Sequence, residues 1–458
     1  MRKILFYILF FCTQAAQAQE ALRTFLNDPA MRHAQISFEL RDLSTNNAIV
    51  EYNSQIACTP ASITKVITTA TALETLGADF RFQTKLAIYG TIDKDGTLQG
   101  NLYIIGGGDP TLGSRFFSNS DFVSTWIEAI HKAGIKKING SVYANTELYD
   151  LNPVPILWLR EDAGNYYAAG VFPLSAFDNS YEITVKSTAN SIEIFDNANY
   201  YSFRNLLKIG TKDSIYILGE PFSQKRSLYG TIRPHQTKSV KGDISNPSQF
   251  LSQYFSEILR QNGIPVSDNL IETANNETII HTHFSPPLKN IAAMTNFFSI
   301  NNYADHLLKH LALQRETVGT FNGALQFQRE FWTNRGIDMS GVFLYDGSGL
   351  SPSNALTAAF MCDVLSYMKP NEAFRLSLPV AGANGTVASF LASTPLKGKV
   401  RVKSGSFRNV QCYAGYISKN NKDYAFCIMV NNFIGERKNV VKLIEQLLVN
   451  SLSETDNQ

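Results

Sequence analysis

The stretch PASITKVITTATALETLG, from Pro60 to Gly77, carries the pattern from which the fold of this chain is predicted. Thr59 is suited to cap a helix, Pro60 to occupy its first position, and Gly77 to end it. Ser62 and Lys65, three residues apart, would then share one face at the start of this helix. Apolar residues at helical spacing predict a core-facing stripe of Ile63, Val66, Ile67, Ala70 and Leu73.

The pair Ser62 and Lys65 has the composition of a nucleophile and its base. A serine hydroxyl is a poor nucleophile until a base takes its proton, and a lysine is such a base only where burial and positive charge depress its pKa. The Ser62 amide, in the first turn, would be free to stabilise an oxyanion. The spacing alone is weak evidence, because Ser366 and Lys369 repeat it at a helix end without other support.

A second group, Ser299-Ile300-Asn301, lies between two predicted helical segments. It offers a hydroxyl for proton relay and an amide that can hold a substrate carbonyl. Ser267-Asp268-Asn269 fits the same pattern, but it follows GIPV inside a mainly β region. We therefore predict that Ser299 belongs to the site and that Ser267 is a turn residue.

A third group, Lys403-Ser404-Gly405-Ser406, follows VRV on a predicted strand. Its cation and hydroxyl can bind a substrate carboxylate, Gly405 lets a peptide lie close to the strand, and the Ser406 amide can complete an oxyanion hole. The three groups occur in the order SxxK, SxN, K(S/T)G that is found in penicillin-binding proteins and serine β-lactamases. This joint order is far more specific than any of the three groups alone.

The order of elements predicts an α+β domain that is split by a large insertion. Alternating strands are expected near both ends of the chain, at residues 35–41 and in QCYAGYIS and DYAFCIMVNNF, with helices between them. Short β-like runs fill the intervening block. The basic, apolar, small-residue pattern of the N-terminus predicts a secretory signal. The predicted boundaries are 1–18 for the signal peptide, 19–84 with 288–458 for the catalytic domain, and 85–287 for the mainly β insertion.

Beyond the three groups, the chain resembles the D-alanyl-D-alanine carboxypeptidase and endopeptidase family called class C low-molecular-mass penicillin-binding proteins. The resemblance runs through nearly the whole predicted mature chain. It is carried, in order, by ALETLGADFRF, GNLYIIGGGDPTL, WLREDAGNYYAAG, FSPPL, SINNYADHLL, DGSGLSPSN, LPVAGANGTV, VKSGSF and YAGYI. It implies a transpeptidase-like domain with an antiparallel sheet flanked by helices, and the gap from Lys65 to Ser299 accommodates the family's inserted domains.

The resemblance also implies a role for each matching residue. Ser62 would attack the carbonyl of the penultimate D-alanine and Lys65 would accept its proton. Ser299 and Lys403 would pass a proton to the departing D-alanine, and Asn301 would hold the substrate amide. The acyl-enzyme would then be hydrolysed by water.

Other positions concern substrate binding. Ser404, with Lys403, would bind the terminal carboxylate, although threonine is usual at this position in the family. Pro352 stands where many relatives carry arginine, which leaves the preferred third residue of the stem peptide open. Asp109, in GGGDPTL, either meets the free amino group of that residue or orders a tight turn.

Charge and composition exclude several classes of function. The chain has 41 basic and 39 acidic residues, and loss of Arg2 and Lys3 with the signal would leave 39 of each, which argues against nucleic acid or an anionic membrane as a partner. No later segment is apolar enough for a membrane span. No metal or other cofactor is predicted, and the pairs His281 with His283 and His306 with His310 are interpreted as solvated or satisfied histidines. The cysteines are read as free thiols, with a bridge between Cys412 and Cys427 left open.

These observations predict a periplasmic serine DD-peptidase that acts on peptidoglycan stem peptides, as carboxypeptidase, endopeptidase or both, and that is inhibited by β-lactams. Two alternatives remain. A β-lactamase would turn over penicillin rapidly. A non-catalytic binder of cell-wall peptides would keep the fold without the reaction, but the intact Ser62, Lys65, Ser299, Asn301 and Lys403 argue against it.

Overall fold

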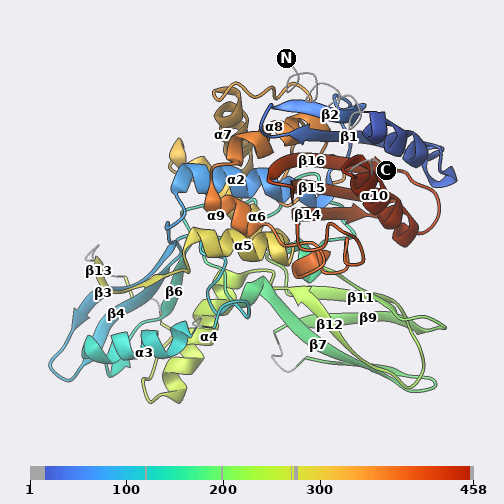
Figure 1. Ribbon diagram of the computed structural model, residues 1–458. Coiled ribbons are helices and arrows are strands. Elements are labelled where there is room, and N and C mark those ends of the chain that lie inside the picture. Colours follow the sequence, from blue (N-terminus) through green and yellow to red (C-terminus); the bar gives the residue numbers. More distant parts are fainter. Residues whose placement is uncertain (1–15, 119–120, 197–199, 270, 273–276, 454–458) are drawn as a thin grey trace. The chain divides into compact units, whose positions relative to one another are not determined.

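The structure is a computed structural model that describes residues 16–118, 121–196, 200–269, 271–272 and 277–453 (Figure 1). These residues form two compact units. The first comprises the described residues up to Ala78, Ala292–Ile300 and those from Leu325 onward, and the second comprises Asp79–Ile291 and Asn301–Ala324. The predicted signal peptide lies outside the described residues except for its last three, and it stays a prediction. Among the described residues, no helix has the length and apolar character needed to cross a membrane.

The first unit contains a five-stranded antiparallel sheet that joins the two ends of the chain. Its order is β14-β15-β16-β1-β2, with β1 (Gln35–Asp42) paired to β16 so that Phe38 lies opposite Ile428. The other bounds are β2 Asn47–Tyr52, β14 Val400–Phe407, β15 Val410–Lys419 and β16 Lys422–Asn431. The expected α+β fold with an antiparallel sheet is therefore confirmed, and β14 lies at the edge of the sheet.

Alternation along β1 decides which helices cover each face of this sheet. Phe38 and Leu40 are buried in the apolar core that includes Ile444 of α10 (Arg437–Ser451). On the opposite face, Ser37 Oγ accepts a hydrogen bond from the amide of Ala358, where α8 (Ala358–Met368) begins. The sheet is thus covered by helices on both faces, as Figure 1 shows.

The helix that carries the decisive sequence begins later than predicted. Residues Ala61–Ile63 form a 3-10 turn, η2, and α2 spans Thr64–Leu76, with Gly77 ending it at φ 88° as predicted. The predicted cap at Thr59 is wrong, because the N-cap position is occupied by Pro60 in η2 and by Ile63 in α2. The Thr59 amide donates to Asn431 Oδ1 at 2.7 Å, which ties this residue to the sheet.

The predicted core-facing stripe of Ile63, Val66, Ile67, Ala70 and Leu73 is buried as expected. Burial extends to all residues from Thr64 to Leu73, so the remaining faces of α2 are enclosed as well. Its buried threonines remain satisfied because Thr69 and Thr71 donate to the carbonyl oxygens of Lys65 and Ile67, four residues back, at 2.7 and 2.8 Å.

The second unit is built from several small sheets together with the helices α3, α4 and α6. One sheet has the order β13-β3-β4-β5, with β6 also paired to β4, and two three-stranded sheets have the orders β12-β7-β8 and β10-β11-β9. The bounds are β3 Gln83–Ile92, β4 Thr97–Ile105, β5 Lys137–Ile138, β6 Val142–Asn145, β7 Ser180–Ser187, β8 Ile192–Phe195, β9 Ser202–Ile209, β10 Ser214–Leu218, β11 Lys225–Ile232, β12 Thr237–Asp243, β13 Glu277–Phe284, α3 Phe122–Lys132, α4 Pro247–Gln261 and α6 Asn301–Leu311.

The compact units and the predicted domains divide the chain differently around α6. The sequence-based boundaries assign residues 301–324 to the catalytic domain, whereas the structure packs them with the second unit. Tyr303 donates to Asp178 Oδ1 at 2.8 Å, and His306 Nε2 lies 3.1 Å from the Phe172 carbonyl oxygen. The remaining helices are α5 Leu288–Phe297, α7 Phe321–Thr333 and α9 Glu372–Ser377. The predicted functional domains remain a prediction.

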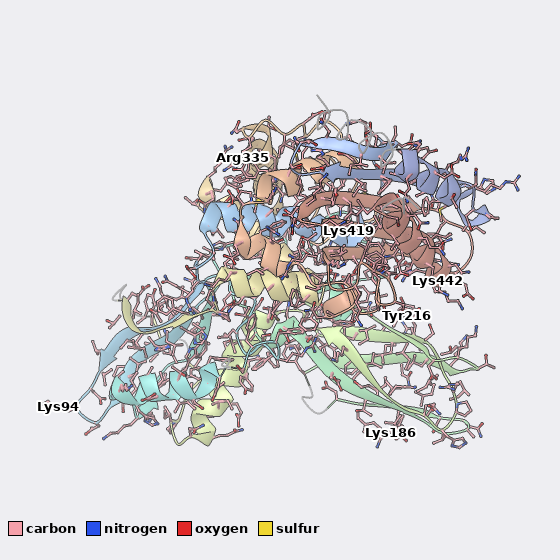
Figure 2. The ribbon with its side chains drawn as sticks, viewed as in Figure 1. Lys94, Lys186, Tyr216, Arg335, Lys419 and Lys442 are labelled. Atoms are coloured by element: carbon pink, nitrogen blue, oxygen red, sulfur yellow. The ribbon has the colours of Figure 1, made fainter. Side chains whose placement is uncertain are left out.

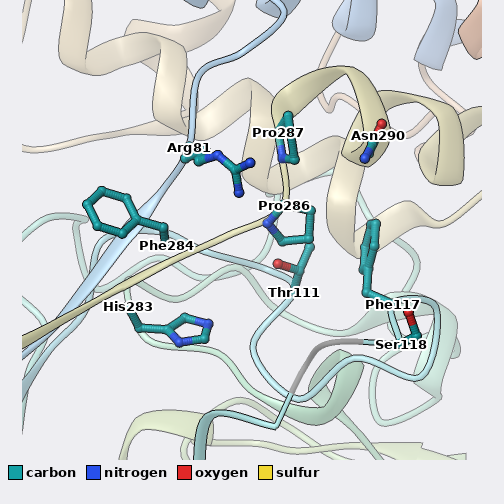
Figure 3. Close-up of a pocket in the computed structure, with 9 residues that line it drawn as sticks. All are labelled: Arg81, Thr111, Phe117, Ser118, His283, Phe284, Pro286, Pro287 and Asn290. Atoms are coloured by element: carbon teal, nitrogen blue, oxygen red, sulfur yellow. The ribbon is translucent and has the colours of Figure 1, made fainter. Parts of the chain in front are cut away.

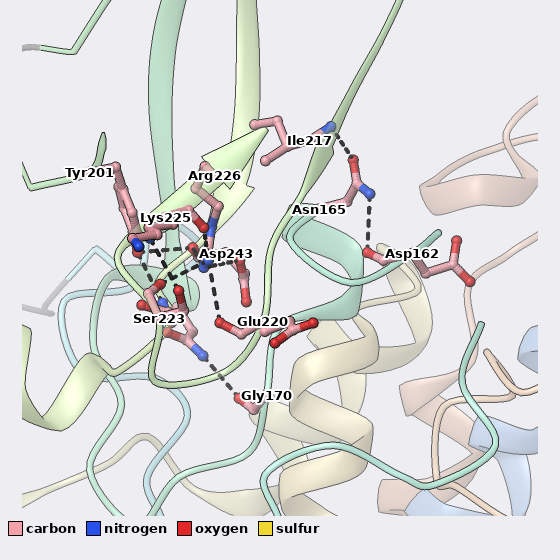
Figure 4. A network of polar contacts seen from close by, with 12 residues as sticks. Asp162, Asn165, Gly170, Tyr201, Ile217, Glu220, Ser223, Lys225, Arg226 and Asp243 are labelled. Atoms are coloured by element: carbon pink, nitrogen blue, oxygen red, sulfur yellow. Dashed lines mark hydrogen bonds and ion pairs between the residues drawn. The ribbon is translucent and has the colours of Figure 1, made fainter. Parts of the chain in front are cut away.

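The second unit contains a buried ion pair, in contrast to exposed charges such as Lys94 and Lys186 (Figure 2). Arg226 is buried, and its Nη2 lies 2.8 Å from Asp243 Oδ1, while its guanidinium stacks 4.8 Å from the centre of the Tyr201 ring (Figure 4). A second bond, from Arg226 Nη1 to the Ser223 carbonyl at 2.9 Å, ties the pair to the turn that precedes β11.

We expect Arg226→Met to destabilise the chain strongly, because it leaves the Asp243 carboxylate buried without its partner. Loss of one member of a buried pair costs about 3–5 kcal/mol. Urea unfolding of the whole chain measures this change. Arg233→Met is the matched control, since Arg233 pairs with Asp213 at an exposed position and little change is expected there. Equal effects of the two substitutions would contradict the assignment.

Candidate active site

The predicted nucleophile and base lie within hydrogen-bond distance of each other. Lys65 is 0% exposed, and its Nζ donates to Ser62 Oγ at 3.0 Å and to the Ser348 carbonyl oxygen at 2.6 Å. Ser62 lies in η2 and Lys65 in the first turn of α2, so the backbone itself sets their separation. The sequence identified this pair but missed Ser348, which takes part through its backbone carbonyl.

The carbonyl of Ser348 is held by a loop that Asp346 organises. The Asp346 carboxylate accepts hydrogen bonds from the amides of Gly349 and Ser351 at 2.7 and 2.6 Å, as expected of a turn-fixing aspartate. Gly349 lies so close to η2 that a side-chain carbon there would be 1.9 Å from the Ala61 carbonyl oxygen. The loop formed by the motif DGSGL therefore positions the carbonyl that accepts a hydrogen bond from Lys65. This motif is the sequence signal by which Ser348 could have been found.

The backbone around Ser62 is constrained from two sides. Ala61 has φ 48°, a value that is uncommon for residues other than glycine, and it is buried beneath Gly349. On strand β14, a carbon added to Gly405 would be 2.6 Å from the Pro60 carbonyl oxygen and 2.8 Å from the Ser62 amide nitrogen. Gly405 thus admits the protein's own backbone, whereas its predicted contact with a substrate peptide remains a prediction.

The second and third sequence groups also meet. Lys403 is 0% exposed, and its Nζ donates to Ser299 Oγ at 3.0 Å and to the Ser404 carbonyl oxygen at 2.6 Å. Burial, followed by the nearby charge of Lys65, lowers the pKa of Lys403 well below its usual value. Ser404 Oγ lies 2.9 Å from Thr386 Oγ1, and Ser406 is exposed on the same edge strand. The first unit therefore holds two buried lysines, each bonded to a serine hydroxyl.

Asn301 and Asp109 belong to the second unit. Asn301 Nδ2 donates to the Tyr167 carbonyl oxygen at 2.8 Å. Asp109 is 2% exposed, and its Oδ1 accepts bonds from the amide and hydroxyl of Thr111 at 2.8 and 2.6 Å. This burial raises the pKa of Asp109 to about 6. The bonds to Thr111 match the turn interpretation, and contact between Asp109 and a substrate stays a prediction.

A known protein family matches nearly the whole chain. The model of the D-Ala-D-Ala carboxypeptidase 3 (S13) family matches residues 18–452. The chain belongs to the S13 family. It is accordingly a serine-type D-Ala-D-Ala peptidase, which confirms the resemblance drawn from the sequence.

Individual proteins with named activities are also similar to this S13 chain over most of its length. A D-alanyl-D-alanine carboxypeptidase of Actinomadura sp. (strain R39) is 26% identical over 446 residues, covering 92% of this chain and 82% of that protein. The carboxypeptidase DacB of Haemophilus influenzae is 24% identical over 420 residues, covering 87% and 85%. The crystal structure of penicillin binding protein 4 (dacB) from H. influenzae has a TM-score of 0.82 at 23% identity, covering 92% of this chain and 97% of that one, which shows a shared fold.

The histidines His306 and His310 of this S13 protein bond to protein groups. His306 is fully buried, with Nδ1 2.8 Å from the Asn302 carbonyl oxygen, and His310 Nδ1 lies 3.1 Å from the Tyr149 hydroxyl. Across the described residues, no group of three or more metal-ligating side chains is found. The four described cysteines are buried and free, including Cys412 and Cys427.

The second unit contains two pockets whose lining residues differ from the predicted site residues. One, of about 370 Å³, is lined by residues that include Arg81, His283, Phe284 and Asn290 (Figure 3). The other, of about 340 Å³, has Phe172 and Phe222 in its lining. None of the predicted catalytic residues lines either pocket, so the chemistry and not the cavity volume locates the site.

Gly405→Ala should impair acylation while Lys65 and Lys403 remain in place. The new methyl group would push on the Ser62 backbone, and a displacement of about 1 Å at a reacting group can cost about 100-fold in rate. The rate of labelling by a fluorescent penicillin measures this change, with the melting temperature recorded in parallel. An undiminished labelling rate in the folded variant would contradict a role for this close approach.

The buried histidines predict a loss of stability in acid. Burial lowers the pKa of both His306 and His310 to about 4, so between pH 6.5 and 4 the unfolded chain binds protons that the folded chain does not. The free energy of unfolding should fall across this window as pH falls, by ~3 kcal/mol per histidine at most. Urea titrations at several pH values measure it.

A double variant, His306→Asn with His310→Asn, should have a shallower slope in the same pH window. His33→Asn is the control, because His33 is exposed. An unchanged slope in the double variant would show that other groups cause the acid sensitivity.

Proposed function

We propose that this S13 peptidase cleaves D-Ala-D-Ala termini, D-Ala crosslinks, or both, in peptidoglycan through an acyl-enzyme on Ser62. The observation that carries this proposal is the pairing of two buried lysines with two serines, at 3.0 Å from Lys65 Nζ to Ser62 Oγ and 3.0 Å from Lys403 Nζ to Ser299 Oγ. A hydroxyl next to a buried amine can lose its proton as it attacks a carbonyl carbon.

Acylation would begin with transfer of the Ser62 proton to Lys65 Nζ as Ser62 Oγ bonds to the carbonyl of the penultimate D-alanine. A buried lysine can act as a base where it reacts in its neutral form. The two lysines share a low-dielectric interior, in which protonation of one disfavours protonation of the other. The depressed pKa of Lys403, caused by burial and then by Lys65, supports the proposal that the two amines do not both carry a proton.

Stabilisation of the oxyanion would come from the amides of Ser62 and Ser406. Gly405 brings the Ser62 amide next to β14, the strand that carries Ser406. Backbone N–H groups fixed in advance are effective at this task because they need no reorganisation when charge develops.

Collapse of the tetrahedral intermediate would break the peptide bond and release D-alanine. Its nitrogen would take a proton that is passed from Lys403 through the Ser299 hydroxyl. Lys65 would pass the proton it took from Ser62 to Lys403, which restores both amines to their starting states. Water would then attack the ester carbonyl with Lys65 accepting its proton, and that proton would pass to Ser62 Oγ as the ester bond breaks. Asn301, two residues after Ser299 in the chain, is proposed to hold the substrate amide.

The edge position of β14 supports a substrate that binds as an added strand. Outward backbone groups of an edge strand can pair with an extended peptide. Lys403 and the Ser404 hydroxyl would bind its C-terminal carboxylate. The protein would act in the periplasm after removal of residues 1–18 and would be inhibited by β-lactams. In support, penicillin binding protein 4 of H. influenzae has been crystallised in complex with a β-lactam.

Intact-mass analysis after incubation with penicillin tests the nucleophile. We expect one stable adduct, on the peptide that contains Ser62, and no adduct with Ser62→Ala. Lys65→Arg should label at least 100-fold more slowly, because a guanidinium stays protonated and cannot act as a base. Ser366→Ala, from the repeated SxxK spacing, is the matched control and should label normally. An adduct elsewhere, or rapid release of hydrolysed penicillin, would contradict the proposal.

A further inference from the structure

We propose that Thr386 is a positioning residue that orients the Ser404 hydroxyl toward the substrate's terminal carboxylate. This inference rests on the proposed function and names a residue to which sequence analysis gave no role. Thr386 Oγ1 lies 2.9 Å from Ser404 Oγ, which is hydrogen-bond distance between two hydroxyls. Thr386 is exposed and Ser404 half-buried, so the pair lies at the surface of the first unit, where a ligand can reach it.

The segment that carries Thr386 is fixed to the sheet. The amide of Val402 donates to the Pro379 carbonyl and that of Ala381 to the Val400 carbonyl, both at 2.9 Å, so the segment runs along β14 just before Ser404. Thr386 itself lies in the 3-10 turn η6, Gly385–Val387, and the following side chain, Val387, is 0% exposed in the core. The Thr386 hydroxyl is therefore presented from a rigid support.

Gly385 allows η6 to lie close to the C-terminal end of α5. It has φ 60°, and a side-chain carbon there would be 2.7 Å from the carbonyl oxygen of Phe297, the last residue of α5. Phe297 is two residues before Ser299, whose hydroxyl accepts a bond from Lys403. The Thr386 hydroxyl thus lies beside Ser404, in the third group of site residues. The adjacent Gly385 packs against Phe297, next to the second group.

The chemistry of two adjacent hydroxyls gives the contact a direction. Each hydroxyl has one proton to donate. If Thr386 donates to Ser404, the proton of Ser404 is left to donate to a carboxylate oxygen, and a hydroxyl that accepts one bond donates the next more strongly. Lys403 Nζ bonds to the Ser404 carbonyl, and when this amine is protonated it adds a positive charge beside the hydroxyl.

The contact also explains how serine can function where the family usually has threonine. A threonine side chain is held in few rotamers by its branched β-carbon, whereas serine rotates more freely. The bond from Thr386 supplies to Ser404 the orientation that branching would otherwise supply. Thr386 should therefore matter most when residue 404 is serine.

Steady-state kinetics with two substrates test this role. The substrates are a peptide ending in D-Ala-D-Ala and the same peptide with an amidated C-terminus. Thr386→Val should reduce kcat/KM for the free acid roughly tenfold, mainly through KM, since it removes one hydrogen bond that supports binding of a charged group. The value for the amide should be almost unchanged. Thr386→Ser, which keeps the hydroxyl, should recover most of the loss.

The decisive comparison repeats Thr386→Val in a Ser404→Thr background, where the loss should shrink to less than about threefold. Thr394→Val is the matched control, because the Thr394 hydroxyl bonds to the Leu391 carbonyl within the same segment. Equal losses for acid and amide, or equal losses in both backgrounds, would overturn the inference and leave only a structural role. A wild-type protein without peptidase activity or a Ser62 adduct would instead overturn the proposed function.

Discussion

The burial of Lys65 is the constraint on which the site depends. An ammonium group removed from water costs several kcal/mol unless hydrogen bonds replace its hydration. Here Lys65 bonds to the Ser62 hydroxyl and to the Ser348 carbonyl. In the sequence, Ser62 comes before the large insertion and Ser348 comes after it. The lysine can be buried only when the chain has closed around it, so formation of the domain and alignment of the pair are one event. The fully enclosed helix α2 follows from the same requirement, because a lysine at its first turn is otherwise left in water.

Close backbone approach then connects the remaining parts. Gly349 admits the Ala61 carbonyl from one side, and Gly405 admits Pro60 and Ser62 from β14 on the other. Each glycine brings a segment from the C-terminal part of the chain against the turn that carries Ser62. The strained φ of Ala61 persists because both sides hold it. The nucleophile is thus positioned mainly by main-chain packing, with hydrogen bonds adding direction.

Much of this site could be predicted from the sequence, because its side chains occur in an ordered series of motifs. The three-residue spacing predicted that Ser62 and Lys65 lie together, and the order of the motifs predicted that Lys403 and Ser299 belong to the same site. Local signals failed where distant groups competed. Thr59 has the composition of a cap, but Asn431 from the sheet takes both its amide and its carbonyl. Ser348 was missed because any residue type can supply a backbone carbonyl. The contact of Gly405 with Pro60 and Ser62 was missed because it depends on how β14 packs against a distant segment, which no short stretch of sequence specifies.

The buried lysines and the buried histidines differ in the groups that their nitrogen atoms contact. His306 and His310 are buried, but their ring nitrogens lie close to the Asn302 carbonyl and the Tyr149 hydroxyl, so they stabilise the second unit. Lys65 and Lys403 each bond to a serine hydroxyl whose proton can move. Two amines that disfavour each other's charge can exchange roles, one accepting a proton during attack while the other supplies one to the leaving group. In the proposed reaction the second buried lysine would thus take part in proton transfer as well as in the fold.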